Sequence, residues 1–362
     1  MAVSLRSSIA KRSSHLNAAL CHLSAVLVDF CYVIINNYFN IISWLKLSRC
    51  GLKYDKAYSD LFDECLTIYE VRELNFDEES DYNSEQDRFY CPDSDCRLDQ
   101  GTKSVLTTVN ANKIKYKKTP HFKDTPSTVH RESCPYSDDE NSIVYVDPKT
   151  SKKEGTKATD YPTEFLLERK KYTKKKKPKV EGTPVESEIN EKTKSTNKTS
   201  SQGNKTSPNT TSVFEHIVEC FLSNQHDKEM LKAMPLTISG VTANYNYFFK
   251  KIRYFQDGQG LIYWGRVKEI KDYKYSFGIV FEDRVSNTSI KAYINKATIQ
   301  SYRKKQYFTN KIRSLISDGD DVNCFFLGSY PELQNVKNGE HEFNVYNVKI
   351  VNLDHFLLRV VE

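Results

Sequence analysis

Glycine is scarce in this chain of 362 residues, where it occurs 13 times, and the sequence contains no glycine-rich loop of the kind that binds phosphate groups. The sequence also lacks the Ser/His/Asp arrangement that supports nucleophilic catalysis. Hydrophobic residues make up only 38% of the chain, although 12% of the residues are aromatic. Low hydrophobic content combined with many aromatic residues indicates folded parts that are joined by polar segments.

The cysteine content argues against a secreted disulfide scaffold. The nine cysteines are an odd number and are scattered over more than 300 residues. Secreted disulfide scaffolds are short and dense in cysteine. The sequence therefore predicts a cytoplasmic protein whose cysteines stay reduced.

Charge is distributed unevenly along the chain, although the net charge is only +6. Residues 150–212 carry 15 Lys and Arg against 8 Asp and Glu, and residues 235–362 carry 18 against 13. The front of the chain is therefore acidic, whereas the middle and the end are basic. This asymmetry predicts an anionic partner for the rear half.

The N-terminal region contains a long apolar run at residues 16–47, preceded by basic residues, which resembles a signal anchor. Asp29 lies in the middle of this run, and an acidic residue there costs about 2.5–3.5 kcal/mol on insertion scales. We therefore expect residues 1–50 to form an apolar leader. A membrane-anchored sensor is the alternative interpretation.

The remaining chain is predicted to be a multidomain α+β protein. Residues 51–149 would form a small zinc-stabilised module, and residues 150–211 a disordered linker, because this Lys-rich segment cannot bury enough apolar surface. Residues 212–362 would form a helix followed by a β domain. Ser212 and Glu215 have the spacing of a capping box, which predicts that this helix begins at Ser212.

Within the first module, residues 52–71 carry apolar side chains at helical spacing, and this pattern predicts a helix. A strand at residues 67–74 is the alternative. Residues 87–91 are predicted to form a short strand that leads into the first cysteine, and residues 103–118 to form a hairpin.

The last 120 residues alternate between apolar and polar positions in several short stretches. Three strands are predicted at residues 262–270, 276–283 and 289–299, then a helix at 303–317, then strands at 322–333 and 343–353. The order β-β-β-α-β-β is that of an OB-fold. The sequence therefore predicts a C-terminal OB-like five-stranded β-barrel.

Five cysteine and histidine residues lie close together in the acidic front part of the chain, namely Cys91, Cys96, His121, His130 and Cys134. Structural zinc takes four such ligands as two pairs, and both Cys91-x4-Cys96 and His130-x3-Cys134 have compatible spacing. A Cys91–Cys96 disulfide, a catalytic Cys/His pair and a chance grouping are the alternatives. The residues alone predict a structural zinc ion but leave the choice of histidine open.

The stretches FYCPDSDC, TPHF and HRESCPY resemble the zinc-finger region of competence-protein CoiA-like proteins and related zinc-ribbon proteins. The resemblance covers about residues 85–137 and depends on Cys91, Pro92, Cys96, His121, Phe122 and Cys134. It implies that Cys91, Cys96, His121 and Cys134 are the zinc ligands, with His130 as the alternative ligand. The usual second histidine of those proteins is Lys123 here, and no counterpart of their nuclease region is visible.

Aromatic and basic residues alternate at the start of the predicted β domain. Bases stack on aromatic rings while Lys and Arg contact phosphates, so this pattern predicts weak, non-specific binding of single-stranded nucleic acid. The candidate residues are Lys250, Lys251, Arg253, Trp264, Arg266 and Lys268. Packing of the aromatic rings in the core is the competing interpretation.

These observations together predict a non-enzymatic, zinc-stabilised binding or scaffold protein that contacts nucleic acid or a protein complex. Its assembly from small modules is typical of bacterial proteins, including accessory parts of anti-phage systems. The alternative is a metal-dependent nuclease, or a subunit of an enzyme, whose site would be the Cys/His cluster with an open coordination position.

Overall fold

The computed structural model describes residues 53–99, 101, 103–137, 161–174, 209–257, 260–338 and 341–361. The chain divides into two compact units, Met1–Leu52 and Lys53–Glu362, and all of the described residues belong to the second. The predicted leader and the apolar run at residues 16–47 therefore lie outside the described residues. Most of the predicted linker also lies outside them.

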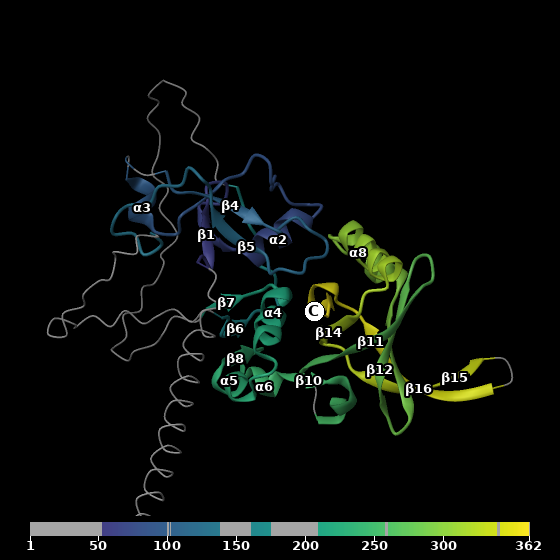
Figure 1. The fold of residues 1–362 in the computed structure, drawn as a ribbon. Helices are drawn as coiled ribbons and strands as arrows, with labels where there is room; N and C mark the ends of the chain where they lie inside the picture. Colours follow the sequence, from purple (N-terminus) through teal and green to yellow (C-terminus); the bar gives the residue numbers. More distant parts are fainter. Residues whose placement is uncertain are drawn as a thin grey trace, which may run out of the picture. The chain divides into compact units, whose positions relative to one another are not determined.

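The second unit has an α+β fold, as predicted, and begins with a five-stranded antiparallel sheet in the order β2-β1-β3-β4-β5 (Figure 1). Aromatic and aliphatic side chains, among them Tyr54, Leu66, Phe89 and Phe122, form the core of this part. Its elements are β1 (Lys56–Ser59), β2 (Glu64–Thr67), α2 (Ile68–Phe76), β3 (Phe89–Tyr90), α3 (Ser94–Leu98), β4 (Val105–Val109) and β5 (His121–Asp124).

The prediction of a helix over residues 52–71 was wrong. The chain forms the β1–β2 hairpin there, and the turn depends on Asp63, whose φ of 60° lies in the left-handed region. The helix α2 starts only after Thr67, whose side chain accepts a hydrogen bond from the backbone N–H of Glu70 while the Glu70 carboxylate accepts one from the backbone N–H of Thr67. This reciprocal capping box terminates β2 and starts the helix at the same residue.

Residues 161–174 are ordered, although the sequence placed them in the disordered linker. They contribute β6 (Glu164–Phe165) to a four-stranded sheet in the order β7-β6-β8-β9, where the other strands are β7 (Thr210–Thr211), β8 (Pro235–Ile238) and β9 (Val241–Asn244). Phe165 is buried in the core of the second unit. A linker made only of polar residues would have no such buried side chain. Arg169 and Lys170 form ion pairs with Asp77 and Glu64 of the first sheet's module.

The helix predicted to begin at Ser212 begins instead at Phe214. This helix, α4 (Phe214–Asn224), has no side-chain cap, and it is followed by the separate helices α5 (Lys228–Ala233) and α6 (Tyr245–Phe248). The Ser212 hydroxyl accepts a hydrogen bond from the backbone N–H of Lys170 at 3.2 Å, so it does not cap α4. Glu215 is turned into the core and does not complete a capping box.

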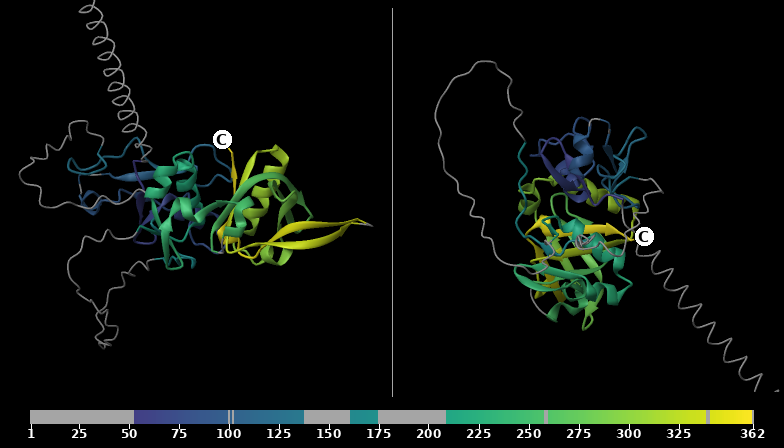
Figure 2. Two further views of the ribbon diagram at one scale, coloured as in Figure 1. Left: turned by 90° about the horizontal axis from the view of Figure 1, so that it is seen from below. Right: turned by 90° about the vertical axis from the view of Figure 1, so that its left-hand side faces the viewer.

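The C-terminal part contains the helix and the first two strands that the sequence predicted, together with additional strands. The strand predicted at residues 289–299 ends at Ile294 and is followed by a short helix, and residues 322–333 form one strand and the start of another. The path of the C-terminal sheet is β15-β16-β13-β12-β11-β14-β17, with β10 paired to β11. The elements are β10 (Phe249–Lys251), η1 (Ile252–Asp257), β11 (Ile262–Asp272), β12 (Phe277–Val285), β13 (Thr288–Ile294), α7 (Lys296–Gln300), α8 (Lys305–Asp318), β14 (Val322–Leu327), β15 (Pro331–Asn338), β16 (His341–Ile350), η2 (Leu353–His355) and β17 (Phe356–Val360). Figures 1 and 2 show the β15–β16 hairpin extending beyond the rest of this sheet.

Among the described residues, hydrogen bonds do not close this sheet into the predicted barrel, because its path ends at β15 on one side and at β17 on the other. The long strand β11 turns the sheet: residues 262–266 pair with β14 and residues 267–272 pair with β12. β16 runs parallel to β13, and after η2 the chain continues as β17, which pairs with β14. The strand predicted at residues 343–353 corresponds to β16, and β17 is a further strand that was not predicted.

Buried charges connect the part that contains β1 to β5 with the elements that follow residue 209. Arg72 on α2 pairs with Glu215 on α4, and Arg359 on β17 pairs with Glu219 on α4 at 2.7 Å. The ring of Tyr116 lies between the two guanidinium groups, at 4.6 and 4.4 Å, and its hydroxyl donates to the glutamates. The two predicted modules are thus joined through a shared buried network.

Candidate metal centre

Three backbone segments meet where the structure gathers three cysteines and one histidine. Cys91 follows β3, and its N–H donates to Ser104 O at 2.9 Å. The segment that continues from β5 returns beside it, since Lys103 and Val129 exchange backbone hydrogen bonds of 3.0 Å. This pairing brings the next residue, His130, and then Cys134 to the cysteine turn.

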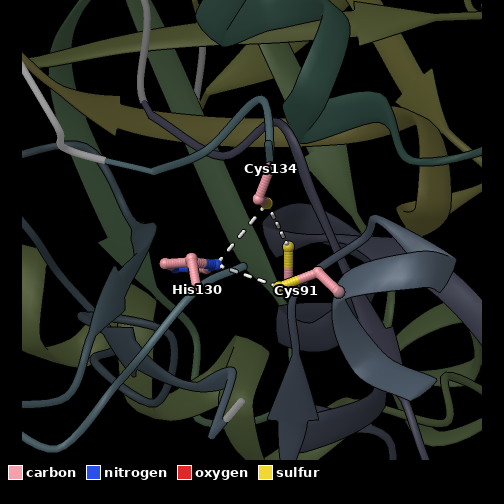
Figure 3. Close-up of side chains that lie close together, drawn as sticks. Cys91, His130 and Cys134 are labelled. Carbon is pink, nitrogen blue, oxygen red and sulfur yellow. Dashed lines mark hydrogen bonds between the residues drawn. The ribbon is translucent and has the colours of Figure 1, made fainter. Parts of the chain in front are cut away.

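The potential ligand atoms of Cys91, Cys96, His130 and Cys134 all lie within 4.8 Å of one another. All three cysteines are buried, and the His130 side chain is only 7% exposed. Figure 3 shows Cys91, His130 and Cys134 pointing toward one common point. The cluster is therefore an enclosed site with four donor groups.

The distances between these donors suit one tetrahedral ion. Cys91 Sγ lies 3.6 Å from Cys134 Sγ, and His130 Nδ1 lies 3.4 Å from Cys96 Sγ and 3.6 Å from Cys134 Sγ. Zinc bonds of about 2.3 Å to sulfur and about 2.0–2.1 Å to nitrogen would place two sulfurs about 3.8 Å apart and a sulfur and a nitrogen about 3.5 Å apart. The donor set and its spacing fit a metal ion of this kind.

Backbone N–H groups point at all three sulfurs. Arg131 N donates to Cys96 Sγ at 3.5 Å. Asp93 N–H and Tyr136 N–H donate to the sulfurs of Cys91 and Cys134, each two residues after its cysteine. A proline follows both of these cysteines, so the same Cys-Pro-x turn occurs twice. These hydrogen bonds favour the thiolate form that a metal requires.

Burial acts in the opposite direction and raises the pKa of both Cys91 and Cys134, and the neighbouring sulfurs raise the pKa of Cys91 further. Three thiolates held together in a buried cluster repel one another unless a cation lies between them. The cluster could therefore hold a cation, whose charge would offset the repulsion between thiolates.

A second set of side chains orients His130. Its Nε2 atom lies 3.0 Å from Asp124 Oδ1 and 2.9 Å from the hydroxyl oxygen of Tyr54. That hydroxyl donates to Asp124 at 2.6 Å, and Lys53 Nζ lies 2.5 Å from the same carboxylate. This contact orients the ring so that Nδ1 faces the sulfurs, and metal-bound histidines commonly have such a carboxylate at the other ring nitrogen.

The charge of Asp124 is stabilised by the same contacts. Burial on its own would raise the pKa of Asp124, but the hydrogen bonds from Lys53, Tyr54 and His130 outweigh it and lower the pKa. Asp124 therefore stays ionised at neutral pH and can hold the histidine in one orientation.

The structure places His121, the histidine that the resemblance implied as a ligand, outside the cluster. His121 begins β5 in register with Val109, and its Nδ1 atom bonds to Thr119 O at 2.9 Å. His130, the alternative ligand, lies with the three predicted cysteines instead. The His130-x3-Cys134 spacing was the sequence signal for this arrangement, whereas Asp124 and Tyr54 carried no signal of their own.

The residues predicted to bind nucleic acid lie in different environments, some packed against the core and others at the surface. Trp264 packs against the core, with its ring stacked on Phe325 at 5.9 Å and in contact with Phe221 of α4. Lys251 lies over the same ring, and Arg266 pairs with Asp321 at 2.7 Å. Lys250 is partly buried on β10, and Arg253 and Lys268 are exposed. Trp264 thus serves largely as a core residue.

Among the described residues, no helix has both the length and the apolar character needed to cross a membrane. Comparison of the chain with protein-family models, with curated proteins and with solved structures finds no match.

Proposed function

We propose that this chain is a non-enzymatic binding or scaffold protein whose first module is stabilised by one structural zinc ion. The observation that carries the proposal is the presence of four protein donors at one buried point, Cys91, Cys96, His130 and Cys134. Structural zinc sites use four protein ligands of this type, including the Cys3His set. The ion would link β3, α3 and the segment after β5, which otherwise share only a small core.

Zinc is the metal that this donor set favours. Thiolate and imidazole ligands in tetrahedral positions are typical of zinc, while calcium and magnesium prefer oxygen ligands. Three thiolates must remain reduced to bind the ion, which supports the proposal of a cytoplasmic protein. The use of His130 departs from the ligand set that the CoiA-like resemblance implied, so we propose kinship with zinc-ribbon modules only for the cysteine turns.

A metal-dependent nuclease is the second candidate function, and the donor set argues against it. A catalytic zinc ion keeps one position open for water or substrate and has three protein ligands. Here four donors surround one point, and His130 is fixed by Asp124. A nuclease function would regain support if metal analysis found three protein ligands and a bound water.

We propose that the partner is nucleic acid or a protein complex, bound by the C-terminal sheet. The topology of this sheet supports an OB-like relationship: β13 and β16 are parallel, and α8 lies between the third and fourth strands, as in an OB-fold. The fifth strand would correspond to β16 and β17 together, interrupted by η2. OB-like domains frequently bind single-stranded nucleic acid.

The test is metal analysis of the full chain purified under reducing conditions. One zinc ion per chain is expected, with an X-ray absorption spectrum that fits three sulfur ligands and one nitrogen ligand. Chelation should unfold residues 53–137, because zinc affinity is folding free energy in small modules. A metal-free chain that keeps this module folded would contradict the proposal.

A further inference from the structure

The outer face of the C-terminal sheet is covered along the first half of β11 and exposed to solvent along the second half. In its first half, Trp264 packs beneath Phe221 of α4, so the face is covered there. The register between β11 and β12 then shifts between Val267 and Glu269, which marks a β-bulge. Beyond the bulge the outer face carries Lys271, and it remains open to solvent.

A groove of about 210 Å³ lies on this open part, across β11, β12, β13, β16 and β15. Strand register places its side chains on one face, because Gly278 pairs with Tyr293 and Val280 pairs with Lys291. The polar and aromatic residues that line it are Lys271, Tyr273, Lys291, Tyr293, Gln334 and Asn347. The last two share a hydrogen bond of 3.0 Å between β15 and β16.

Gly278 makes room for an aromatic ring at one end of the groove. A Cβ atom at this position would lie 3.0 Å from the Tyr273 ring, so a larger residue would displace the tyrosine. Tyr273 therefore rests on the strand while remaining 55% exposed, and Tyr293 on the neighbouring strand is 38% exposed. Two tyrosine rings thus remain accessible to a ligand on the same surface of the sheet.

The charge around these rings is mainly positive. Among the described residues, Lys271 and Lys291 line the groove and no carboxylate does. Lys291 lies over the Phe343 ring at 5.5 Å and has no carboxylate partner among the described residues. Lys271 is 3.5 Å from Glu269, an exposed pair that water screens strongly.

The turn beside the groove repeats this pairing of cations and rings. Tyr275 is 53% exposed, and Lys274 and Lys296 lie over its ring at 5.2 and 4.5 Å. In the part of the chain that the structure describes, neither lysine forms an ion pair. The groove and the turn beside it therefore present aromatic rings next to lysines, and among the described residues Lys274, Lys291 and Lys296 form no ion pair.

We propose that this groove, defined by Lys271, Tyr273, Lys291 and Tyr293 with Tyr275 and Lys296 beside it, binds single-stranded nucleic acid. Every base offers a face for stacking, and lysines can follow the phosphates, so the surface suits a single strand of any sequence. A duplex would hide its bases from the tyrosines. The proposal rests on the proposed binding function and moves its site away from Trp264.

The experiment measures binding of a fluorescent 12-nucleotide oligo-dT to the full, zinc-loaded chain by anisotropy at 50 to 200 mM salt. Tyr273→Ala with Tyr293→Ala should weaken binding at least about fivefold without changing the salt dependence, because stacking releases no counterions. Lys291→Ala with Lys296→Ala should reduce the slope of log K against log salt by about 1.4, since about 0.7 is lost for each phosphate contact. Tyr273, Tyr293 and Lys296 are exposed and Lys291 is half-buried, so circular dichroism checks that both variants fold.

Lys251→Ala with Lys268→Ala removes the same charge from the other half of the sheet and is the matched control. The control should retain the slope of the wild-type chain. If the control loses affinity while the groove variants keep it, the groove assignment is wrong although nucleic-acid binding stands. If the wild-type chain ignores the oligonucleotide, or if poly-glutamate competes equally well, the groove proposal also fails. The zinc content of the same samples tests the proposed scaffold function separately.

Discussion

Arg72 on α2 and Glu215 on α4 form an ion pair inside the protein, with Arg72 Nε 3.2 Å from Glu215 Oε2, although 143 residues separate them in the sequence. Nη2 of Arg72 also donates to Glu215, at 3.3 Å, and Nη1 donates to the carbonyl oxygens of Asn110, Ala111 and Lys113. The Arg72 side chain is 1% exposed, so these contacts take the place of bonds to water. This pair joins the module of the metal centre to the rest of the unit.

Removal of either partner should therefore destabilise the protein strongly. Arg72→Met or Glu215→Gln is expected to cost about 3–5 kcal/mol, because each leaves a buried charge without its partner. The double variant should lose less than the sum of the two. Urea denaturation followed by tyrosine and tryptophan fluorescence measures this. Arg266→Met, which breaks an exposed pair with Asp321, is the control and should hardly change the midpoint.

Acid should weaken the same pair at a defined pH. Burial on its own would raise the pKa of Glu215, but the charges of Arg72 and Lys311 outweigh it and lower the pKa to about 2. A carboxylate with a lowered pKa stabilises the fold above its unfolded pKa of about 4.3 and loses that contribution as the pH falls toward 2. Glu215→Gln should flatten the stability curve in this window, and an unchanged curve would contradict the assignment.

His216 is expected to destabilise the protein in mild acid. Burial is the main reason why its pKa falls to about 3, with Lys56 adding to the effect and Glu215 opposing it. Its ring stacks on Tyr69 at 4.6 Å, and Nδ1 has no hydrogen-bond partner among the described residues. The unfolded chain takes up a proton below a pH of about 6.5 while the folded chain does not, so stability falls as the pH drops from about 6.5 toward 3.

His216→Phe keeps the stacked ring but cannot be protonated. In the variant, the slope of the unfolding free energy against pH should be smaller by up to about 1.4 kcal/mol per pH unit. Urea midpoints between pH 4 and 7 measure this slope. The exposed His226 provides the matched control, since His226→Phe should leave the dependence in place. Equal curves for the wild-type chain and the His216 variant would show that this residue does not cause the effect.

The two candidate ligand histidines can be separated directly. His130→Ala should lose the zinc ion and unfold residues 53–137, because it removes one of four donors. His121→Ala should retain one zinc ion per chain, since its ring faces Thr119 O instead of the cluster. Zinc stoichiometry by mass spectrometry distinguishes them. Retention of zinc by the His130 variant and loss by the His121 variant would favour the ligand set that the resemblance implied.

Asp124 should affect zinc affinity without binding the ion. Asp124→Asn removes the charge that accepts from His130 Nε2, and a loss of about 10- to 100-fold in affinity is expected. Competition with a chromophoric chelator measures the affinity. Glu132→Gln changes an exposed carboxylate in the same loop and should have no effect. Equal losses in both variants would point to a general charge effect instead.

The sequence by itself determined the local features of this protein. Cys91, Cys96 and Cys134 were recognisable as candidate metal ligands because the Cys-x4-Cys spacing and the two Cys-Pro turns are short patterns that can be read directly from the sequence. The strands β11, β12 and β16 and the helix α8 were also predicted, since alternation and helical spacing are local patterns. The open sheet was not predicted, because β17 follows η2 and pairs with β14 instead of continuing beside β13.

Tertiary structure alone decided the choice of histidine and the union of the two modules. The His130-x3-Cys134 spacing is the local feature that favours His130, but it did not by itself exclude His121 as the ligand. The pairing of Lys103 with Val129 brings His130 to the cysteines and leaves His121 on β5. Likewise, Glu215 has the spacing of a capping residue, yet it pairs with Arg72 from 143 residues away. Such contacts depend on how distant segments of the chain pack together, and local sequence patterns carry no information about that packing.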